Sequence, residues 1–136
     1  LLEESLMADV INSNIKDTVH FTGWLEKHKV DAYLRKTQVL VLPSYAEGFP
    51  NVILEAMSVG IPVIATKVGA IPDTISHNVN GTLITLKSID SLESSMEKYI
   101  KYPDLIETQS KEALSTVLRE HSYEQNLTKL FNLLIC

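Results

Sequence analysis

The fold of this chain is decided by the stretch Pro43-Ser44-Tyr45-Ala46-Glu47-Gly48-Phe49-Pro50-Asn51-Val52-Ile53-Leu54-Glu55-Ala56-Met57. The apolar run 39–42 (Val-Leu-Val-Leu) comes just before it and predicts a strand buried on both faces. A polar loop that carries Glu47 then leads into a predicted helix, with Pro50 where the first helical residue is often proline. This helix is apolar apart from Glu55, and a buried charge is costly without a partner. We therefore expect Glu55 to bind a ligand.

Composition and charge exclude several kinds of protein. The chain has 136 residues, which is enough for one domain. Its net charge of −5 argues against a broad nucleic-acid surface, which would be basic. The one cysteine, Cys136, excludes an internal disulfide and fits a reducing compartment, and no apolar run approaches the ~20 residues of a membrane span. With no visible leader and Leu1 in place of methionine, we expect residues 1–136 to be a single partial domain of a longer cytoplasmic protein.

The spacing of apolar residues predicts alternating helices and strands. Helices are expected over residues 1–14, 30–36, 50–59, 71–75, 89–100, 105–119 and 122–134, and strands over residues 19–21, 39–42, 62–66 and 82–86. Gly60 is a typical residue to end a helix, and Asn80-Gly81 indicates a turn. This alternation predicts an α/β fold with a Rossmann-like parallel sheet and flanking helices, followed by C-terminal helices.

The junction between the strand at 39–42 and the next helix is suited to bind an anion. Ligands of open α/β sheets bind at the carboxyl ends of the strands, where this junction lies. A helix start presents unpaired N–H groups and a partial positive charge, which favour phosphate. Pro50 has no N–H, so the expected donors are the N–H groups of Gly48, Phe49, Asn51 and Val52. Glu55, one turn beyond Asn51, can accept both hydrogen bonds of a ribose diol, and Glu47 would lie nearer the rest of the ligand.

A purely structural explanation of the same residues stays open. In it the stretch is a buried strand, a turn and a core helix, and both Glu47 and Glu55 point into solvent. The apolar neighbours of Glu55 argue against this explanation more strongly than the surroundings of Glu47, which stands in a polar loop.

A longer pattern in this region reads Pro43-Ser44-x-x-Glu47-Gly48-Phe49-Pro50-Asn51-x-x-Leu54-Glu55-Ala56-Met57-x-x-Gly60-x-Pro62-Val63-Ile64-Ala65-Thr66. It resembles the nucleotide-sugar site of family-four glycosyltransferases, which are retaining enzymes of the GT-B fold with two Rossmann-like domains. The resemblance is to the C-terminal, donor-binding domain. It continues in order through residues 19–23, 69–73 and 80–81 and covers roughly residues 1–130, a combination far more specific than a lone glycine motif.

The resemblance implies roles for the matching residues. Glu55 would hold the ribose hydroxyls of the donor nucleotide, and Glu47, near the donor sugar, would be the catalytic residue. The backbone N–H groups that would meet the phosphates and the sugar hydroxyls are those of Gly48, Phe49, Asn51 and Val52.

The resemblance also implies an activity and its partners. The complete enzyme would be a hexosyltransferase that moves a sugar from a nucleotide diphospho-sugar to a hydroxyl acceptor, without a metal ion or another cofactor. The acceptor would be a glycan or a lipid-linked sugar held by an N-terminal domain. The protein would work in the cytoplasm or peripherally at the inner face of the membrane, in polysaccharide or glycolipid biosynthesis.

Two departures from the family pattern bear on the site and on the sheet. Gly69-Ala70 and Asp73 stand where the family often has two glycines and a glutamate, and Ala70 suits its position unless a positive φ is needed there. The family's first strands, with an arginine and a lysine that hold the diphosphate, have no counterpart here, and residues 37–66 contain neither Arg nor Lys. We therefore expect a gap between the strands at 19–21 and 39–42, with a free edge that invites self-association.

Two other functions stay open at this stage. One is a sugar-nucleotide epimerase of the GT-B fold, although the spacing of Glu47 and Glu55 around Gly-Phe-Pro-Asn favours a transferase. The other is a non-catalytic module that binds a nucleotide-sugar or a protein partner. As an isolated chain, residues 1–136 are expected to bind nucleotide weakly and to transfer no sugar.

Overall fold

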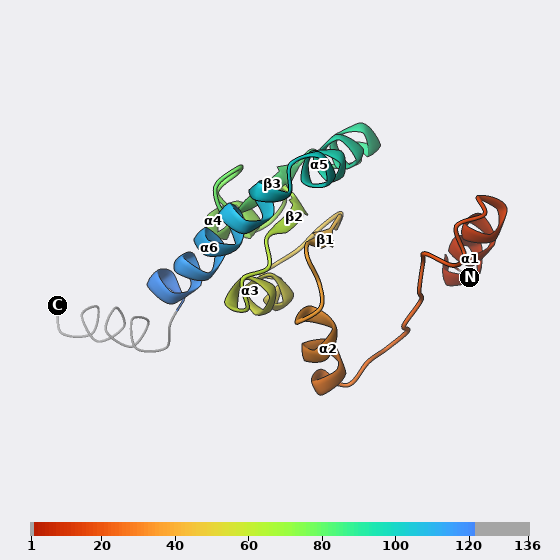
Figure 1. Cartoon of the computed structure of the whole chain (residues 1–136), viewed down its shortest axis with the longest axis horizontal. Helices are drawn as coiled ribbons and strands as arrows, with labels where there is room; N and C mark the ends of the chain where they lie inside the picture. Colours follow the sequence, from red (N-terminus) through yellow and green to blue (C-terminus); the bar gives the residue numbers. More distant parts are fainter. Residues whose placement is uncertain (1, 122–136) are drawn as a thin grey trace. The chain divides into compact units, whose positions relative to one another are not determined.

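The structure is a computed structural model that describes residues 2–121 (Figure 1). The chain divides into two compact units, residues 1–31 and 32–136. The first unit contains α1 (Leu2–Asn12), which confirms the helix expected at the start of the chain, and α2 (Lys27–Leu34) spans the boundary between the units. That the whole chain acts as one partial domain stays a prediction.

The strand expected at residues 19–21 is wrong, because no strand lies between α1 and α2. The backbone just before it turns on itself instead: the N–H groups of Thr18 and Val19 both donate to the carbonyl of Ile15, at 3.0 and 3.2 Å. A strand is held by hydrogen bonds to a neighbouring strand, and no described segment pairs with these residues. The gap expected beside this strand therefore has no counterpart in the described residues, and self-association stays a prediction.

The second unit is built on a parallel sheet. Its strands are β1 (Leu40–Leu42), β2 (Val63–Thr66) and β3 (Gly81–Ile84), in the order β1-β2-β3. Ile64 of β2 pairs with Val41 of β1 and with Thr82 of β3. The central strand β2 is buried along its whole length, as its continuous apolar sequence predicts. These strands confirm the predicted α/β fold and three of the four predicted strands.

Helices follow each strand (Figure 1). They are α3 (Asn51–Ser58), α4 (Ile71–Thr74), α5 (Ile89–Lys101) and α6 (Pro103–Glu120), which confirm four predicted helices within two residues at each end. Ser88 caps α5, since its side chain accepts a hydrogen bond from the Ser91 N–H at 3.1 Å. The helix predicted over 122–134 lies outside the described residues.

The end of α3 confirms the role predicted for Gly60. This glycine has φ +75°, a left-handed conformation that most residues avoid. Its N–H donates to the carbonyl of Met57, and the Ile61 N–H donates to the carbonyl of Ala56, both at 3.0 Å. This pair of bonds is the Schellman motif, which satisfies the last carbonyls of the helix.

Apolar side chains pack on both faces of the sheet. Ile64 and Ile84 form a buried cluster with Tyr99 of α5. Because side chains alternate along a strand, Val63 and Ala65 of β2 face the other way, and both are fully buried. Helix α3 contacts β2 and packs against α6. The sheet therefore holds the end of β1 and the start of α3 on a buried support.

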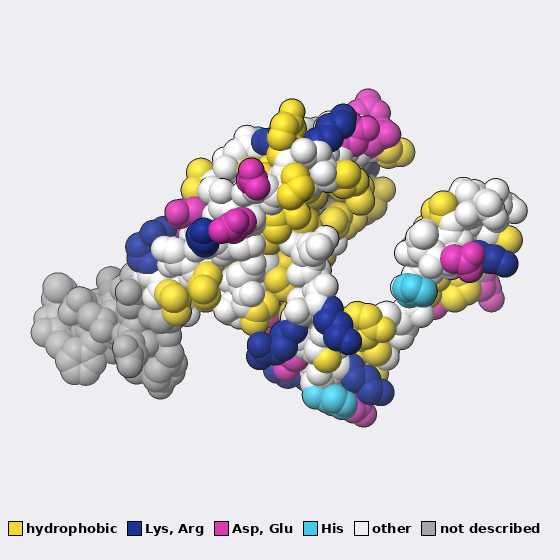
Figure 2. Space-filling view, viewed as in Figure 1, with side chains coloured by type: hydrophobic (Ala, Val, Ile, Leu, Met, Phe, Trp, Pro, Cys, Tyr) yellow, Lys and Arg dark blue, Asp and Glu magenta, His cyan; other side chains and the backbone are white. Residues whose placement is uncertain are grey.

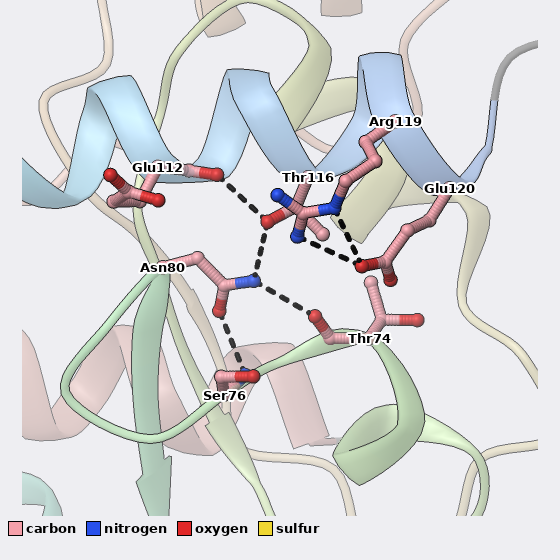
Figure 3. Close-up of polar contacts among 7 residues, drawn as sticks. All are labelled: Thr74, Ser76, Asn80, Glu112, Thr116, Arg119 and Glu120. Carbon is pink, nitrogen blue, oxygen red and sulfur yellow. Dashed lines mark hydrogen bonds and ion pairs between the residues drawn. The ribbon is translucent and has the colours of Figure 1, made fainter.

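Buried Asn80 connects the segment before β3 to α6 (Figure 3). Its side chain is 2% exposed. Its Oδ1 accepts from the Ser76 N–H at 2.8 Å, and its Nδ2 donates to the carbonyl of Thr74 at 3.0 Å and to Thr116 Oγ1 at 3.1 Å. Thr116 Oγ1 in turn donates to the carbonyl of Glu112 at 2.8 Å. The residue predicted to mark a turn is thus also a buried connection between distant segments.

Apolar side chains remain at the surface over α5 (Figure 2). The exposed large apolar residues of this helix are Ile89, Met96 and Ile100. Helix α5 therefore buries one side, which carries Tyr99, and leaves apolar groups on another. Within residues 2–121, no helix is long and apolar enough to cross a membrane.

Candidate functional site

The loop between β1 and α3 lies at the carboxyl edge of the sheet, as predicted. β1 ends at Leu42 and α3 begins at Asn51. Pro50 is the residue before the helix rather than its first residue, because its backbone is extended (φ −76°, ψ 106°). Pro50, at the N-cap position, provides no side-chain cap for this helix start. The first N–H groups of α3 therefore have to find partners elsewhere.

The four predicted donors have no partner in the part of the chain that the structure describes. Within residues 2–121, none of these N–H groups donates a hydrogen bond; they belong to Gly48, Phe49, Asn51 and Val52. Three of the four residues are exposed and Val52 is half-buried. The partial positive charge of a helix start adds to these donors. The arrangement can bind an anion or a row of hydroxyl oxygens.

Glu47 is half-buried and is held at its side chain. Ser44 Oγ donates a hydrogen bond to Glu47 Oε1 at 2.6 Å. A hydrogen bond to a carboxylate is stronger than one between neutral groups. The carboxylate predicted to be catalytic is thus fixed in direction by a residue three positions earlier.

The turn after β2 lies directly against the backbone of Glu47. Gly69 has φ +54°, and a Cβ placed on it would lie 1.9 Å from the Glu47 carbonyl oxygen. The Ala70 N–H donates to the Gly48 carbonyl at 3.1 Å. Ala70 itself has φ −86°, so the expectation that alanine suits this position is confirmed. Asp73 is exposed in the first turn of α4.

Glu55 lies at the border of the buried face of α3. Ile53, Ala56 and Met57 of this helix are buried, whereas Asn51 is exposed and Glu55 is half-buried. The helix is therefore buried on one side rather than all round, and Glu55 is less enclosed than its apolar neighbours suggested. Glu55 follows Asn51 by four residues and so stands above the unpaired donors on the same face. The structure brings all six predicted site residues together at one helix start.

Two aromatic side chains of the loop contact residues that the sequence did not point to. The Phe49 and His121 ring centroids are 6.1 Å apart, with the rings tilted by 41°. Lys87 Nζ lies 5.7 Å from the centre of the Tyr45 ring, which is 70% exposed. Tyr45 and Lys87 also line a pocket of about 290 Å³ at the ends of the strands. Because these partners are more than 40 residues apart in the sequence, no local pattern could have found them.

Within residues 2–121, no group of three His, Cys, Asp or Glu side chains is placed so that it could hold a metal ion. The polar groups that the loop and the start of α3 offer to a ligand are backbone N–H groups and the carboxylates of Glu47 and Glu55.

Comparisons with known proteins identify the family of this chain. The family model described as "Glycosyl transferases group 1" matches residues 3–116. The N-acetyl-alpha-D-glucosaminyl L-malate synthase of Bacillus anthracis is 33% identical over 116 residues, which cover 85% of this chain and 29% of that protein. The chain spans about a quarter of the length of the curated relatives it matches.

Solved structures share the fold. A sucrose-phosphate synthase from Thermosynechococcus elongatus superposes with a TM-score of 0.83 and 27% identity, over 97% of this chain and 34% of that one. Anabaena Alr3699/HepE, solved in complex with UDP, superposes with a TM-score of 0.82 and 22% identity. This superposition covers 95% of this chain and 36% of that one. Both superpositions show that this chain shares the fold of those structures. From the match over residues 3–116, this chain belongs to the family of group 1 glycosyl transferases, which have the GT-B fold.

Proposed function

We propose that this chain is the donor-binding part of a retaining glycosyltransferase, which moves a sugar from a nucleotide diphospho-sugar to a hydroxyl acceptor. The observation that carries the proposal is the start of α3, where four backbone donors without a partner in the described residues stand between two glutamates. Family membership supports sugar transfer. The UDP complex of the similarly folded HepE supports a nucleotide as ligand.

The donors at Gly48, Phe49, Asn51 and Val52 suit the charge that develops during transfer. When the bond between the sugar and the diphosphate breaks, negative charge grows on the leaving phosphate oxygen. Fixed N–H groups need no reorganisation to meet that charge, and in other enzymes the loss of one such donor costs about 10²–10³ in rate. Part of this charge is also met by the partial positive end of α3.

The two glutamates have different roles in this proposal. Glu55, one turn into α3, accepts hydrogen bonds from the two ribose hydroxyls. Glu47, before the helix, faces the donor sugar, and Ser44 keeps its carboxylate in one direction. The separation of the glutamates by the helix start matches a ligand whose diphosphate lies between its ribose and its sugar.

The same proposal accounts for what the loop lacks. A diphosphate carries at least two negative charges, and residues 37–66 contain neither Arg nor Lys. We infer that side-chain cations for the diphosphate, and the groups that hold the acceptor, come from other parts of the complete gene product. The isolated chain should then bind nucleotide weakly and transfer no sugar.

Nucleotide binding to the complete gene product tests the role of Glu55. Saturation-transfer NMR with UDP- and GDP-sugars should show binding, and Glu55→Ala should lower the affinity at least tenfold because two hydrogen bonds to a carboxylate are lost. Glu112→Ala on the exposed side of α6 is the matched control and should bind like the wild type.

A 2′-deoxy nucleotide makes this test specific for the ribose. It should bind the wild type more weakly than the ribonucleotide, and Glu55→Ala should bind both equally, because the acceptor for the hydroxyl is gone. Undiminished binding of the ribonucleotide to Glu55→Ala would refute the ribose role.

A further inference from the structure

We propose that the turn at Gly69-Ala70 positions the donor-binding loop, so that both residues are positioning residues for the proposed nucleotide-sugar site. This inference rests on the proposed function for its consequence in binding, but its structural part concerns the loop alone. The turn follows β2 and is some 20 residues from the loop in sequence, yet it contacts the backbone of Glu47 and Gly48.

The first argument is steric. A Cβ on Gly69 would lie 1.9 Å from the carbonyl oxygen of Glu47, 2.9 Å from its carbonyl carbon and 3.1 Å from the carbonyl oxygen of Gly48. All three are backbone atoms, so no side-chain rotation can relieve the contact. Any side chain at position 69 must therefore displace either the turn or the loop.

The turn at Gly69-Ala70 is held more firmly than the loop at Glu47-Gly48. It is flanked by Thr66 and Ile71, which are 2% and 1% exposed. It is closed by hydrogen bonds from the Val68 N–H to the Thr66 carbonyl at 2.8 Å and from the Ile71 N–H to the Val68 carbonyl at 3.2 Å. Gly48 on the other side is exposed. A side chain at position 69 should therefore move the loop, because the turn is anchored in the core.

The second argument concerns the direction of one donor. In a trans peptide the C=O and the N–H point in opposite directions, and the described chain has no cis peptide bond. The Gly48 carbonyl points at the Ala70 N–H, at 3.1 Å. The Phe49 N–H, which belongs to the same peptide unit, must then point away from the turn. Ala70 thereby aims a proposed ligand donor outward.

Backbone strain at Gly69 is a separate effect that a matched control can remove. Gly60 also has a positive φ, +75°, but a Cβ placed on it would meet only the Ser110 carbonyl oxygen, at 3.8 Å. Gly60→Ala therefore imposes strain of the same kind without touching the loop. The difference between Gly69→Ala and Gly60→Ala isolates the steric contact with Glu47.

The experiment uses the complete gene product with ¹⁵N-labelled phenylalanine, in which the Phe49 amide is assigned by its loss in Phe49→Tyr. Both glycine variants should unfold at lower temperature than the wild type. Only Gly69→Ala should shift the Phe49 amide resonance and lower the affinity for UDP or GDP, by tenfold or more. If the Phe49 amide resonance has the same chemical shift in Gly69→Ala as in Gly60→Ala, the proposal is overturned.

The experiment still decides the proposal if the wild type binds no nucleotide or if Gly69→Ala does not fold. If the wild type binds no nucleotide, the proposed function fails, while the Phe49 amide still decides whether the turn positions the loop. If Gly69→Ala does not fold, Ala70→Pro replaces it, because φ −86° at this position is close to that of proline. The proline ring carbon takes the place of the N–H that points at the Gly48 carbonyl, so the hydrogen bond is lost and the Gly48–Phe49 peptide must move. An unshifted Phe49 amide in Ala70→Pro would then refute the proposal.

Discussion

Asn80→Ala should destabilise the protein by about 2–4 kcal/mol, because three hydrogen bonds of a buried side chain are lost together. The loss is unequal among its partners. Ser76 is exposed, so water can replace the bond to its N–H at little cost. The Thr74 carbonyl is bonded in a buried setting and would lose its partner, at about 1–3 kcal/mol. Thr116 keeps its bond to Glu112, so its hydroxyl loses only an incoming bond, at about 0.5–1.5 kcal/mol.

These losses of stability are measured by urea unfolding of four proteins: the wild type, Asn80→Ala, Thr116→Val and the double variant. Thr116→Val should cost about 1 kcal/mol, since it removes one of the three bonds of Asn80. The two substitutions should be non-additive, because the same bond is lost in both. If Asn80→Ala stays within about 0.5 kcal/mol of the wild type, the range of ordinary surface substitutions, then Asn80 does not connect the segment before β3 to α6 and the reasoning is refuted.

Two other predictions concern the loop and the core. Ser44→Ala in the complete gene product should lower kcat about tenfold with little change in the donor KM, because the Glu47 carboxylate loses its donor. Ser44→Thr should restore kcat, and Ser115→Ala, on the exposed side of α6, is the matched control and should keep the wild-type kcat. A wild-type kcat for Ser44→Ala would contradict the role of Ser44. Burial raises the pKa of the Tyr99 phenol above its ordinary value of 10.0, and the hydrogen bond with Thr82 lowers this pKa by less. The unfolded chain therefore releases the phenol proton first, so stability should fall as the pH rises from about 10 through the folded pKa. Tyr99→Phe should abolish this loss of stability at alkaline pH. The variant should be less stable than the wild type by about 1–3 kcal/mol at pH 7, because Gln109 and Thr82 lose a buried hydrogen-bond partner. Urea unfolding of both proteins at pH 7 and above about pH 10 tests this prediction, and midpoints that fall in parallel would refute it.

Sequence predictions succeeded where the signal is local. The strands at residues 39–42 and 62–66 were predictable because continuous apolar runs of this length suit a strand buried on both faces. The end of α3 at Gly60 was predictable because a left-handed residue after a helix is a local requirement. The strand at residues 19–21 was wrong because an alternating triplet becomes a strand only beside a neighbour.

The candidate site also has features that follow from the local sequence and features that depend on tertiary contacts. The sequence by itself determined which residues stand at the start of α3: the four N–H donors, with Glu47 before the helix and Glu55 one turn into it, follow from chain order and helix geometry. Only the tertiary structure decided how that loop is held. The contact of Gly69 with Glu47, the bond from Ala70 to Gly48 and the pairing of Phe49 with His121 join segments 20 to 70 residues apart. Such contacts depend on how the strands and helices pack, and packing leaves no periodic signal in the sequence around either partner.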